Sequence, residues 1–207
     1  MGAMRTDVPA DRHGSFARVV KNLVLPRPIA WVSTLSAAGV DNLAPHSFFT
    51  VASTTPTVVQ FVSTGEKDSL RNIRATGEFV VNLAPAELFE QINATSTDYP
   101  AEISEFDAVG LTREPSLTVA APRVAESPAA IECRLFRDPL QIGDGFLVFG
   151  EVTHVAVAEE AMGERGPVVQ RLHPIARLGH DEWGELGRIR SIRRIPYRVA
   201  DPEADLP

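Results

Sequence analysis

Short stretches rich in β-branched and aromatic residues recur along the chain, and most are bounded by Gly, Pro, Asn or Asp. This pattern is typical of β-strands, because such side chains pack well on a pleated surface and the bounding residues favour turns. Many short strands with few helices favour a mainly β fold, a closed or partly closed antiparallel barrel. The regular strand–helix alternation of a parallel α/β sheet is absent. The predicted strands span residues 29–35, 43–49, 58–62, 79–83, 129–136, 146–158 and 175–178.

Helical signals are fewer. The first predicted helix begins near Lys67-Asp68-Ser69, where Asp68 or Ser69 can cap its first turn, and it ends by Gly77. A second helix starts after Pro85, with apolar residues on one side. A third, short helix is expected over residues 104–109.

Length and composition set the broad class. A chain of 207 residues with 44% hydrophobic content can bury one substantial core, so a single domain over residues 1–207 is expected, with flexible ends at 1–15 and 200–207. The net charge of −7 argues against nucleic acid or an anionic membrane as the main partner. No apolar run approaches the length of a membrane span, and the first 25 residues lack a signal-peptide core. We therefore expect a cytoplasmic protein.

Cysteine and histidine usage argues against two kinds of site. Cys133 is the single cysteine, which fits a reducing compartment, and alternation places it on one face with Ile131 and Leu135. A buried strand cysteine is therefore predicted rather than a catalytic thiol. The five histidines show no paired ligand spacing, so no metal site is predicted, and no catalytic residue is assigned.

A loop that enters the first predicted helix suggests phosphate binding. Helix N-termini offer free N–H groups to anions, and Lys67 and Ser69 add an ammonium and a hydroxyl nearby. Asp68 would repel a phosphate, so we expect it to cap the helix and point away. The alternative interpretation is an ordinary, well-capped surface helix.

Two neighbouring segments strengthen the case for a phosphorylated, flat, aromatic cofactor. Ser33 and Thr34 place hydroxyls at the end of a predicted strand, and residues 42–49 return as its hairpin partner. Pro45 cannot donate to a ladder, so an interruption there would leave neighbouring N–H groups free for a ring. His46 and Ser47 supply polar tips beside two phenylalanines. Each segment alone could be structural; their occurrence together favours a binding site.

These residues resemble the FMN-binding split-barrel flavoproteins of the flavin reductase-like group, which includes flavoredoxin-type proteins. The resemblance runs from about Arg27 to Arg198, and several separate blocks occur in the right order. The most specific blocks are Arg27-Pro-Ile-Ala-Trp-Val-Ser-Thr, Asn42-Leu-Ala-Pro-His-Ser-Phe-Phe, Lys67-Asp-Ser-Leu-Arg-Asn-Ile and Gly77-Glu-Phe-Val-Val-Asn-Leu.

The resemblance implies a six-stranded Greek-key barrel that forms a homodimer, with FMN near the subunit interface. It also implies a set of cofactor-binding residues in three groups. Along the flavin and ribityl chain lie Ser33, Thr34 and Leu35; at the isoalloxazine ring lie His46, Ser47 and Phe48; at the ribityl phosphate lie Ser63, Lys67 and Ser69.

One departure from the family pattern concerns the electron donor. NADH-dependent members commonly carry a Gly-Asp-His-Thr segment, whereas this chain has Gly143-Asp-Gly-Phe, with Gly145 in place of the histidine. This weakens the case for fast reduction by NADH, and NADH or NADPH remains only a candidate reductant. The leading hypothesis is an FMN-dependent oxidoreductase that serves a small-molecule donor or acceptor, or a monooxygenase or other redox partner. The alternatives are a non-catalytic FMN-binding electron carrier and a barrel that has lost its flavin.

Overall fold

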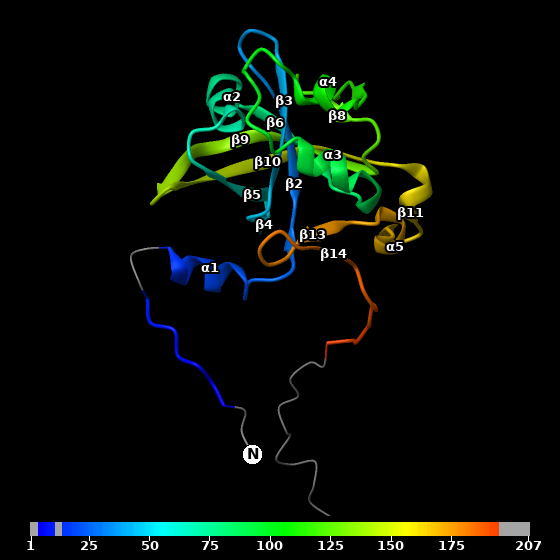
Figure 1. Ribbon diagram of the computed structural model, residues 1–207. Coiled ribbons are helices and arrows are strands. Elements are labelled where there is room, and N and C mark those ends of the chain that lie inside the picture. The colour runs from blue at the N-terminus through cyan, green and yellow to red at the C-terminus, as the bar shows by residue number, and fades with distance from the viewer. Residues whose placement is uncertain (1–3, 11–13, 195–207) are drawn as a thin grey trace, which may run out of the picture.

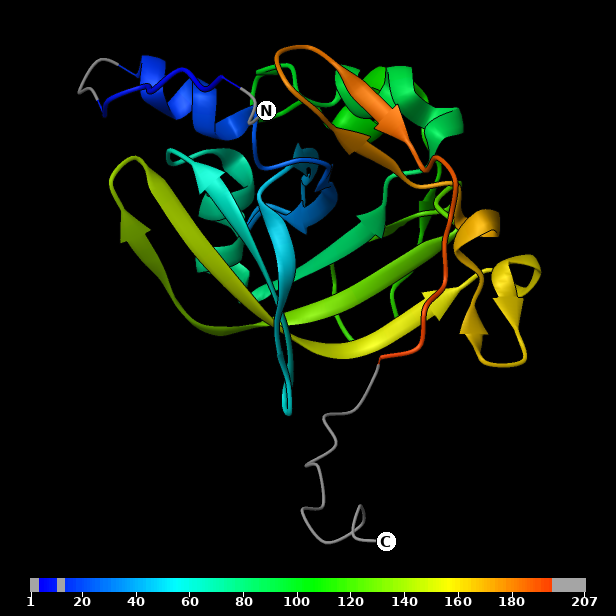
Figure 2. The same ribbon diagram turned by 90° about the horizontal axis from the view of Figure 1, so that it is seen from below.

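The computed structural model describes residues 4–10 and 14–194 of the chain (Figure 1). Its centre is a seven-stranded antiparallel sheet with the order β3-β2-β6-β9-β10-β5-β4. Seen from below, the strands curl around an interior, and the long β9–β10 hairpin extends past it (Figure 2). The strands are β2 (Ala30–Leu35), β3 (Asp41–His46), β4 (Phe49–Thr54), β5 (Thr57–Thr64), β6 (Glu78–Leu83), β9 (Ala129–Ile142) and β10 (Gly145–Val157).

Three smaller sheets border this barrel. The one that bears on the site has the order β1-β13-β14 and pairs a segment before β2 with segments after β10. It consists of β1 (Arg27–Pro28), β13 (Ile175–Arg177) and β14 (Trp183–Glu185). The other two are the pairs β7 (Arg113–Glu114) with β8 (Arg123–Val124), and β11 (Met162–Gly163) with β12 (Gly166–Pro167).

The helices are short and lie around the barrel. They are α1 (Ser15–Lys21), α2 (Asp68–Thr76), α3 (Phe89–Ala94), α4 (Glu105–Val109) and α5 (Val169–Leu172), with 3₁₀ turns η1 (Ala86–Leu88) and η2 (Glu159–Ala161). The three predicted helices are confirmed as α2, η1–α3 and α4. Helix α1 was not predicted, because it has no side-chain cap and leaves Val19 and Val20 exposed, so its apolar pattern is weak.

The sheet is buried on both faces at β2 and β6. Val32 of β2 joins a cluster with Phe61, Phe79 and Cys133, whereas its neighbour Trp31 joins a second cluster on the opposite face. This confirms the predicted buried strand cysteine. Burial, together with the charge of Glu132, raises the pKa of the Cys133 thiol to about 12, so the thiol stays protonated and acts as an apolar side chain.

Two local predictions were wrong. Strand β3 runs through Pro45, which lies opposite Trp31, and continues to His46 before it breaks. Proline is tolerated because β3 is an edge strand of the sheet. The predicted 43–49 strand is therefore two strands, and the sheet has seven strands where the resemblance implied six.

The predicted cap of α2 also differs. Lys67, not Asp68 or Ser69, occupies the N-cap position, and no side chain caps the helix. The predicted end of α2 is confirmed, since Gly77 adopts a left-handed φ of 73° at the C-cap. The helix thus ends as expected but begins with uncapped N–H groups.

Of the predicted flexible ends, residues 200–207 lie outside the described residues. In the other end, residues 4–10 have no regular secondary structure. No described helix has the length and apolar character needed to cross a membrane.

Candidate functional site

Two cavities meet where β3 ends, and Pro45, His46 and Thr64 line both of them. We call one the α2 cavity, about 410 Å³ in volume, which lies at the start of α2 between Lys67 and Ser69 and residues 95–99. We call the other the basic cavity, about 460 Å³. Its lining includes Arg18, Lys21, Asn22, Arg27, Ser47, Phe48, Arg177, His180 and Asp181.

The start of α2 supplies hydrogen-bond donors to the α2 cavity. The first N–H groups of a helix have no intrahelical partner, and here no side chain caps them. Ser69 is buried, and its Oγ accepts a hydrogen bond of 3.2 Å from Nδ2 of Asn42. Lys67 is half exposed, and its Nζ lies 3.1 Å from Oδ1 of Asp98. This corner can therefore hold an oxyanion by backbone, hydroxyl and ammonium groups.

Acidic side chains also line the α2 cavity, but three of them have cationic partners. Glu66 pairs with Arg74, Asp68 pairs with Arg71, and Asp98 pairs with Lys67. The prediction that Asp68 points away from this corner was wrong, because Asp68 lines the cavity; its pairing with Arg71 partly compensates its charge.

A fourth acid of this cavity, Glu105, is buried and accepts an N–H bond of 2.8 Å from Leu43. Burial raises the pKa of the Glu105 carboxyl, while the hydrogen bond from Leu43 acts in the opposite direction. Glu105 is also the residue that ties α4 to β3, so its first role is to hold the wall of the cavity.

Residues 95–99 form the wall opposite α2, and sequence analysis missed them. Thr95, Ser96, Thr97 and Tyr99 bring hydroxyl groups to the α2 cavity. The side chain of Thr95 is held in place, because Nε1 of Trp31 donates a 2.9 Å hydrogen bond to its Oγ1. The run of three hydroxyl residues after a predicted helix was the available signal.

His46 lies on the boundary between the two cavities. Its ring is buried against Phe61, with the ring centroids 4.6 Å apart, and its Nε2 lies 3.4 Å from Oγ of Ser69. Burial, and to a lesser extent the charge of Lys67, lowers the pKa of His46 to about 4. The imidazole is therefore neutral at pH 7, with one nitrogen that donates and one that accepts.

The buried, neutral state of His46 predicts a dependence of stability on pH. The unfolded chain takes up this proton near pH 6.5, whereas the folded chain does so only near its folded pKa of about 4. Stability should therefore fall as the pH is lowered from 6.5 to 4, by about 3 kcal/mol from this residue. Urea unfolding at pH 7 and pH 4.5 measures the effect. In the His46→Gln variant the fall should be smaller, and an equal fall would contradict the assignment.

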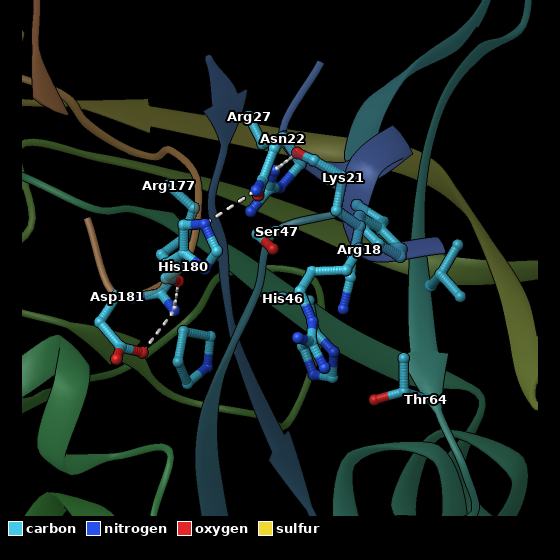
Figure 3. A pocket seen from close by; sticks show the side chains of 13 residues that line it. Arg18, Lys21, Asn22, Arg27, His46, Ser47, Thr64, Arg177, His180 and Asp181 are labelled. Carbon is cyan, nitrogen blue, oxygen red and sulfur yellow. Dashed lines mark hydrogen bonds and ion pairs between the residues drawn. The ribbon is translucent and has the colours of Figure 1, made fainter. Parts of the chain in front are cut away.

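The basic cavity brings together segments from the two ends of the chain. Figure 3 shows the α1 side chains Arg18 and Lys21 on one side, with His180 and Asp181 of the turn after β13 on the other. Asn22 joins the two sides, since its Nδ2 lies 3.0 Å from Nε2 of His180. Sequence analysis missed this cavity because it depends on contacts between residues far apart in the chain.

Of the nine predicted cofactor-binding residues, five line the two cavities. His46, Ser47 and Phe48 line the basic cavity, and Lys67 and Ser69 line the α2 cavity, which His46 shares. The structure thus brings the predicted ring group and most of the predicted phosphate group into one continuous region. Their contact with FMN stays a prediction.

The other four predicted residues do not line either cavity, and three hydroxyls among them are used within the protein. Ser33 Oγ donates to the carbonyl of Pro122 at 2.5 Å and accepts from Asn82 at 3.1 Å. Thr34 Oγ1 accepts a hydrogen bond of 3.0 Å from Nδ2 of Asn72, and Ser63 Oγ donates one of 2.9 Å to the carbonyl of Gly65. Leu35 is half-buried at the end of β2. Their assignment to the flavin stays a prediction.

Comparison with known proteins supplies a family. Residues 22–173 match the model of the flavin reductase like domain. A curated protein of Aquifex aeolicus is 39% identical over 168 residues, which cover 78% of this chain and 85% of the relative.

Two solved structures are similar over nearly the whole chain. Nitrilotriacetate monooxygenase component B from Bacillus cereus has a TM-score of 0.85 and 29% identity, covering 93% of this chain and all of its own. The 2-nitrobenzoate 2-nitroreductase from Pseudomonas fluorescens has a TM-score of 0.84 and 30% identity, covering 94% of this chain and all of its own. The structural neighbours include flavin reductases with a split barrel domain, which confirms the predicted fold.

Proposed function

The chain belongs to the family of flavin reductase-like domains, and from this we propose that it is an FMN-dependent oxidoreductase. It would act in the cytoplasm as a single domain that binds FMN and passes electrons from a reduced pyridine nucleotide or another donor. The observation that carries this proposal is the pair of joined cavities, one with oxyanion donors and one beside a buried aromatic pair. Bound FMN would supply the electron-transfer chemistry.

The α2 cavity fits the phosphate end of FMN. Its donors are the free N–H groups of the first turn of α2, the Lys67 ammonium and the hydroxyls of Thr64 and Ser69. Asp98 would have to share or release Lys67, and because Asp98 is almost fully exposed this costs little. The hydroxyls of residues 95–99 extend the same polar wall.

The boundary between the cavities fits the polar edge of the flavin ring. His46 presents a neutral ring, and Ser47 follows at the break between β3 and β4. Phe48 is partly exposed there and offers apolar area. These residues would orient the ring by hydrogen bonds and packing, and no acid or base among them needs to transfer a proton.

The relatives support electron transfer to another molecule rather than a structural role. One neighbour is a component of nitrilotriacetate monooxygenase, and another is a 2-nitrobenzoate 2-nitroreductase. The donor stays open, because Gly145 brings no side chain where the family histidine is expected. Gly145 lies opposite Thr64 in the sheet, and Thr64 lines both cavities. A histidine at position 145 would therefore lie in the region of the proposed site.

An absorption spectrum of the purified protein mixed with FMN tests the proposal directly. The protein should retain flavin after gel filtration, and anaerobic NADH or NADPH should bleach the flavin bands. Retained flavin that neither nucleotide bleaches would instead favour the carrier that receives electrons from a protein partner. Failure to bind any FMN would exclude both.

We also propose that the protein is a homodimer. An apolar groove of about 270 Å³ lies near the small sheet, and Ile29, Phe49, Ile131 and Ile175 are among its lining residues. Apolar grooves of this kind on a small protein are suited to cover by a second subunit. The chain has a mass of 22.5 kDa, and sedimentation velocity should give twice that mass. A monomer at micromolar concentration would contradict this.

A further inference from the structure

Positive charge is concentrated in the basic cavity, although the chain as a whole carries a net charge of −7. Arg18, Lys21, Arg27 and Arg177 line the cavity, and Asp181 is the one acid among its lining residues. Asp181 is fully exposed and 3.9 Å from Arg177. Within the described part of the chain, Arg18 and Lys21 have no carboxylate in salt-bridge distance. The cavity therefore holds more positive charge than its own acids compensate.

Arg27 is the buried member of this group. It is 8% exposed, and its two Nη atoms donate to the backbone carbonyls of Lys21, Val24 and Leu178. Its Nε is buried and has no hydrogen-bond partner among the described residues. Burial, and then the charge of Arg177, lowers the pKa of Arg27 from its ordinary value. A buried guanidinium with only neutral partners and one free donor is stabilised when an anion approaches.

Two of these cations also lie against aromatic rings. The guanidinium of Arg177 lies 4.8 Å from the centre of the Trp183 ring, and that of Arg27 lies 6.0 Å from the Phe48 ring. Such contacts leave the charge available to a ligand while they fix its position. The arrangement suits recognition of a planar anionic group by arginine.

We propose that the basic cavity binds the anionic group of the small molecule that exchanges electrons with the flavin. This inference rests on the proposed function, because it names the substrate class of the same site. The cavity shares His46 with the α2 cavity, so a molecule held there lies beside the proposed ring position and away from the proposed phosphate position. The shared chemistry is a carboxylate of an organic acid or a phosphate of a pyridine nucleotide.

Charge reversal on α1 tests the inference. Arg18 and Lys21 are exposed, and the variant Arg18→Glu with Lys21→Glu keeps good helix formers in α1. Calorimetric titration of the FMN-loaded protein at low salt would use benzoate and adenosine 2′-monophosphate as probes. We expect at least one probe to bind the wild type, and the double variant to bind it about tenfold or more weakly. Benzoate binding would identify organic acids as the source, and nucleotide binding would identify a pyridine nucleotide.

Matched controls separate this result from general charge effects. Arg137→Glu reverses an exposed charge on β9 outside the cavity, and it should leave the probe affinity within about twofold. Arg27→Lys keeps the charge but removes the Nη donors that hold the carbonyls of Lys21, Val24 and Leu178 in the cavity wall, so it should also weaken probe binding. No binding of either probe to the wild type, or equal binding by the double variant, would overturn the inference.

Parallel FMN titration distinguishes failure of this inference from failure of the proposed function. Retained FMN affinity with lost probe binding supports the inference as stated. If the charge-reversed variant loses FMN while Lys67→Ala keeps it, the basic cavity takes the cofactor phosphate, and the inference is wrong. If the wild type binds no FMN, the proposed function fails, whatever the probes show.

Discussion

Replacing Lys67 and Ser69 together by alanine is expected to weaken FMN binding by about 3 to 6 kcal/mol, at least a hundredfold rise in Kd. Each residue would lose a charge-assisted hydrogen bond to the phosphate, and each such bond contributes about 1.5 to 3 kcal/mol. Both side chains line the α2 cavity, one from the N-cap and one from the first turn of α2. Quenching of FMN fluorescence in a titration measures the change.

Single variants show whether the effect comes from binding or from folding. Lys67 is half exposed, so Lys67→Ala should reduce FMN affinity with little change in thermal stability. Ser69 is buried and holds Asn42, so Ser69→Ala should also cost some stability. Unchanged FMN affinity in a folded double variant would remove the phosphate assignment.

The variant Asp98→Asn is expected to change FMN affinity in the opposite direction. Asp98 pairs with Lys67 at 3.1 Å and is 90% exposed. Its removal frees the ammonium for the phosphate, so FMN should bind slightly more tightly, within about 1 kcal/mol. Lys67→Ala and Asp98→Asn together test whether Lys67 acts on FMN through its charge.

Local pattern was sufficient to predict most of the framework. Alternation and turn residues indicated each strand of the main sheet except β4, because strand signals depend on neighbouring residues. The basic cavity could not be predicted in this way, since Asn22 and His180, which close it, are 158 positions apart. Helix α1 supplies two of its cations, yet its seven residues carry neither a cap nor a buried stripe.

Ser33 illustrates the limit within the site. A hydroxyl at a strand end looked available for a ligand, and its role depends on which face of β2 it occupies. Alternation places Ser33 with Trp31, on the face opposite Val32, where Asn82 and the carbonyl of Pro122 take its hydrogen bonds. The partners come from distant segments, so sequence analysis could not identify them.

Loss of the buried ion pair of Arg123, which follows Pro122, with Glu132 has the second large expected effect. Replacing Arg123 by methionine should destabilise the fold by about 3 to 5 kcal/mol, because it leaves the buried Glu132 carboxylate without its cation. Glu132 is fully buried and Arg123 is 6% exposed. Arg123 Nε donates to Oε1 of Glu132 at 2.9 Å, and Oε1 also accepts the N–H of Leu117, while Oε2 accepts the N–H of Thr118. Urea unfolding at pH 7 measures the loss.

The pH dependence of the Arg123→Met effect separates the lost ion pair from lost packing. Burial raises the pKa of Glu132, but hydrogen bonds from Thr118, Leu117 and Arg123 outweigh it and lower the pKa to about 2. The unfolded carboxyl titrates near 4.3, so this stabilisation is present above that pH and is lost as the pH falls towards 2. The free energies of unfolding of the wild type and the variant should therefore differ most at neutral pH and less at pH 3.

Arg134→Ala, which removes an exposed cation 3.8 Å from Glu78, is the control and should change stability by less than about 1 kcal/mol. A difference at pH 3 as large as that at pH 7 would assign the effect to packing.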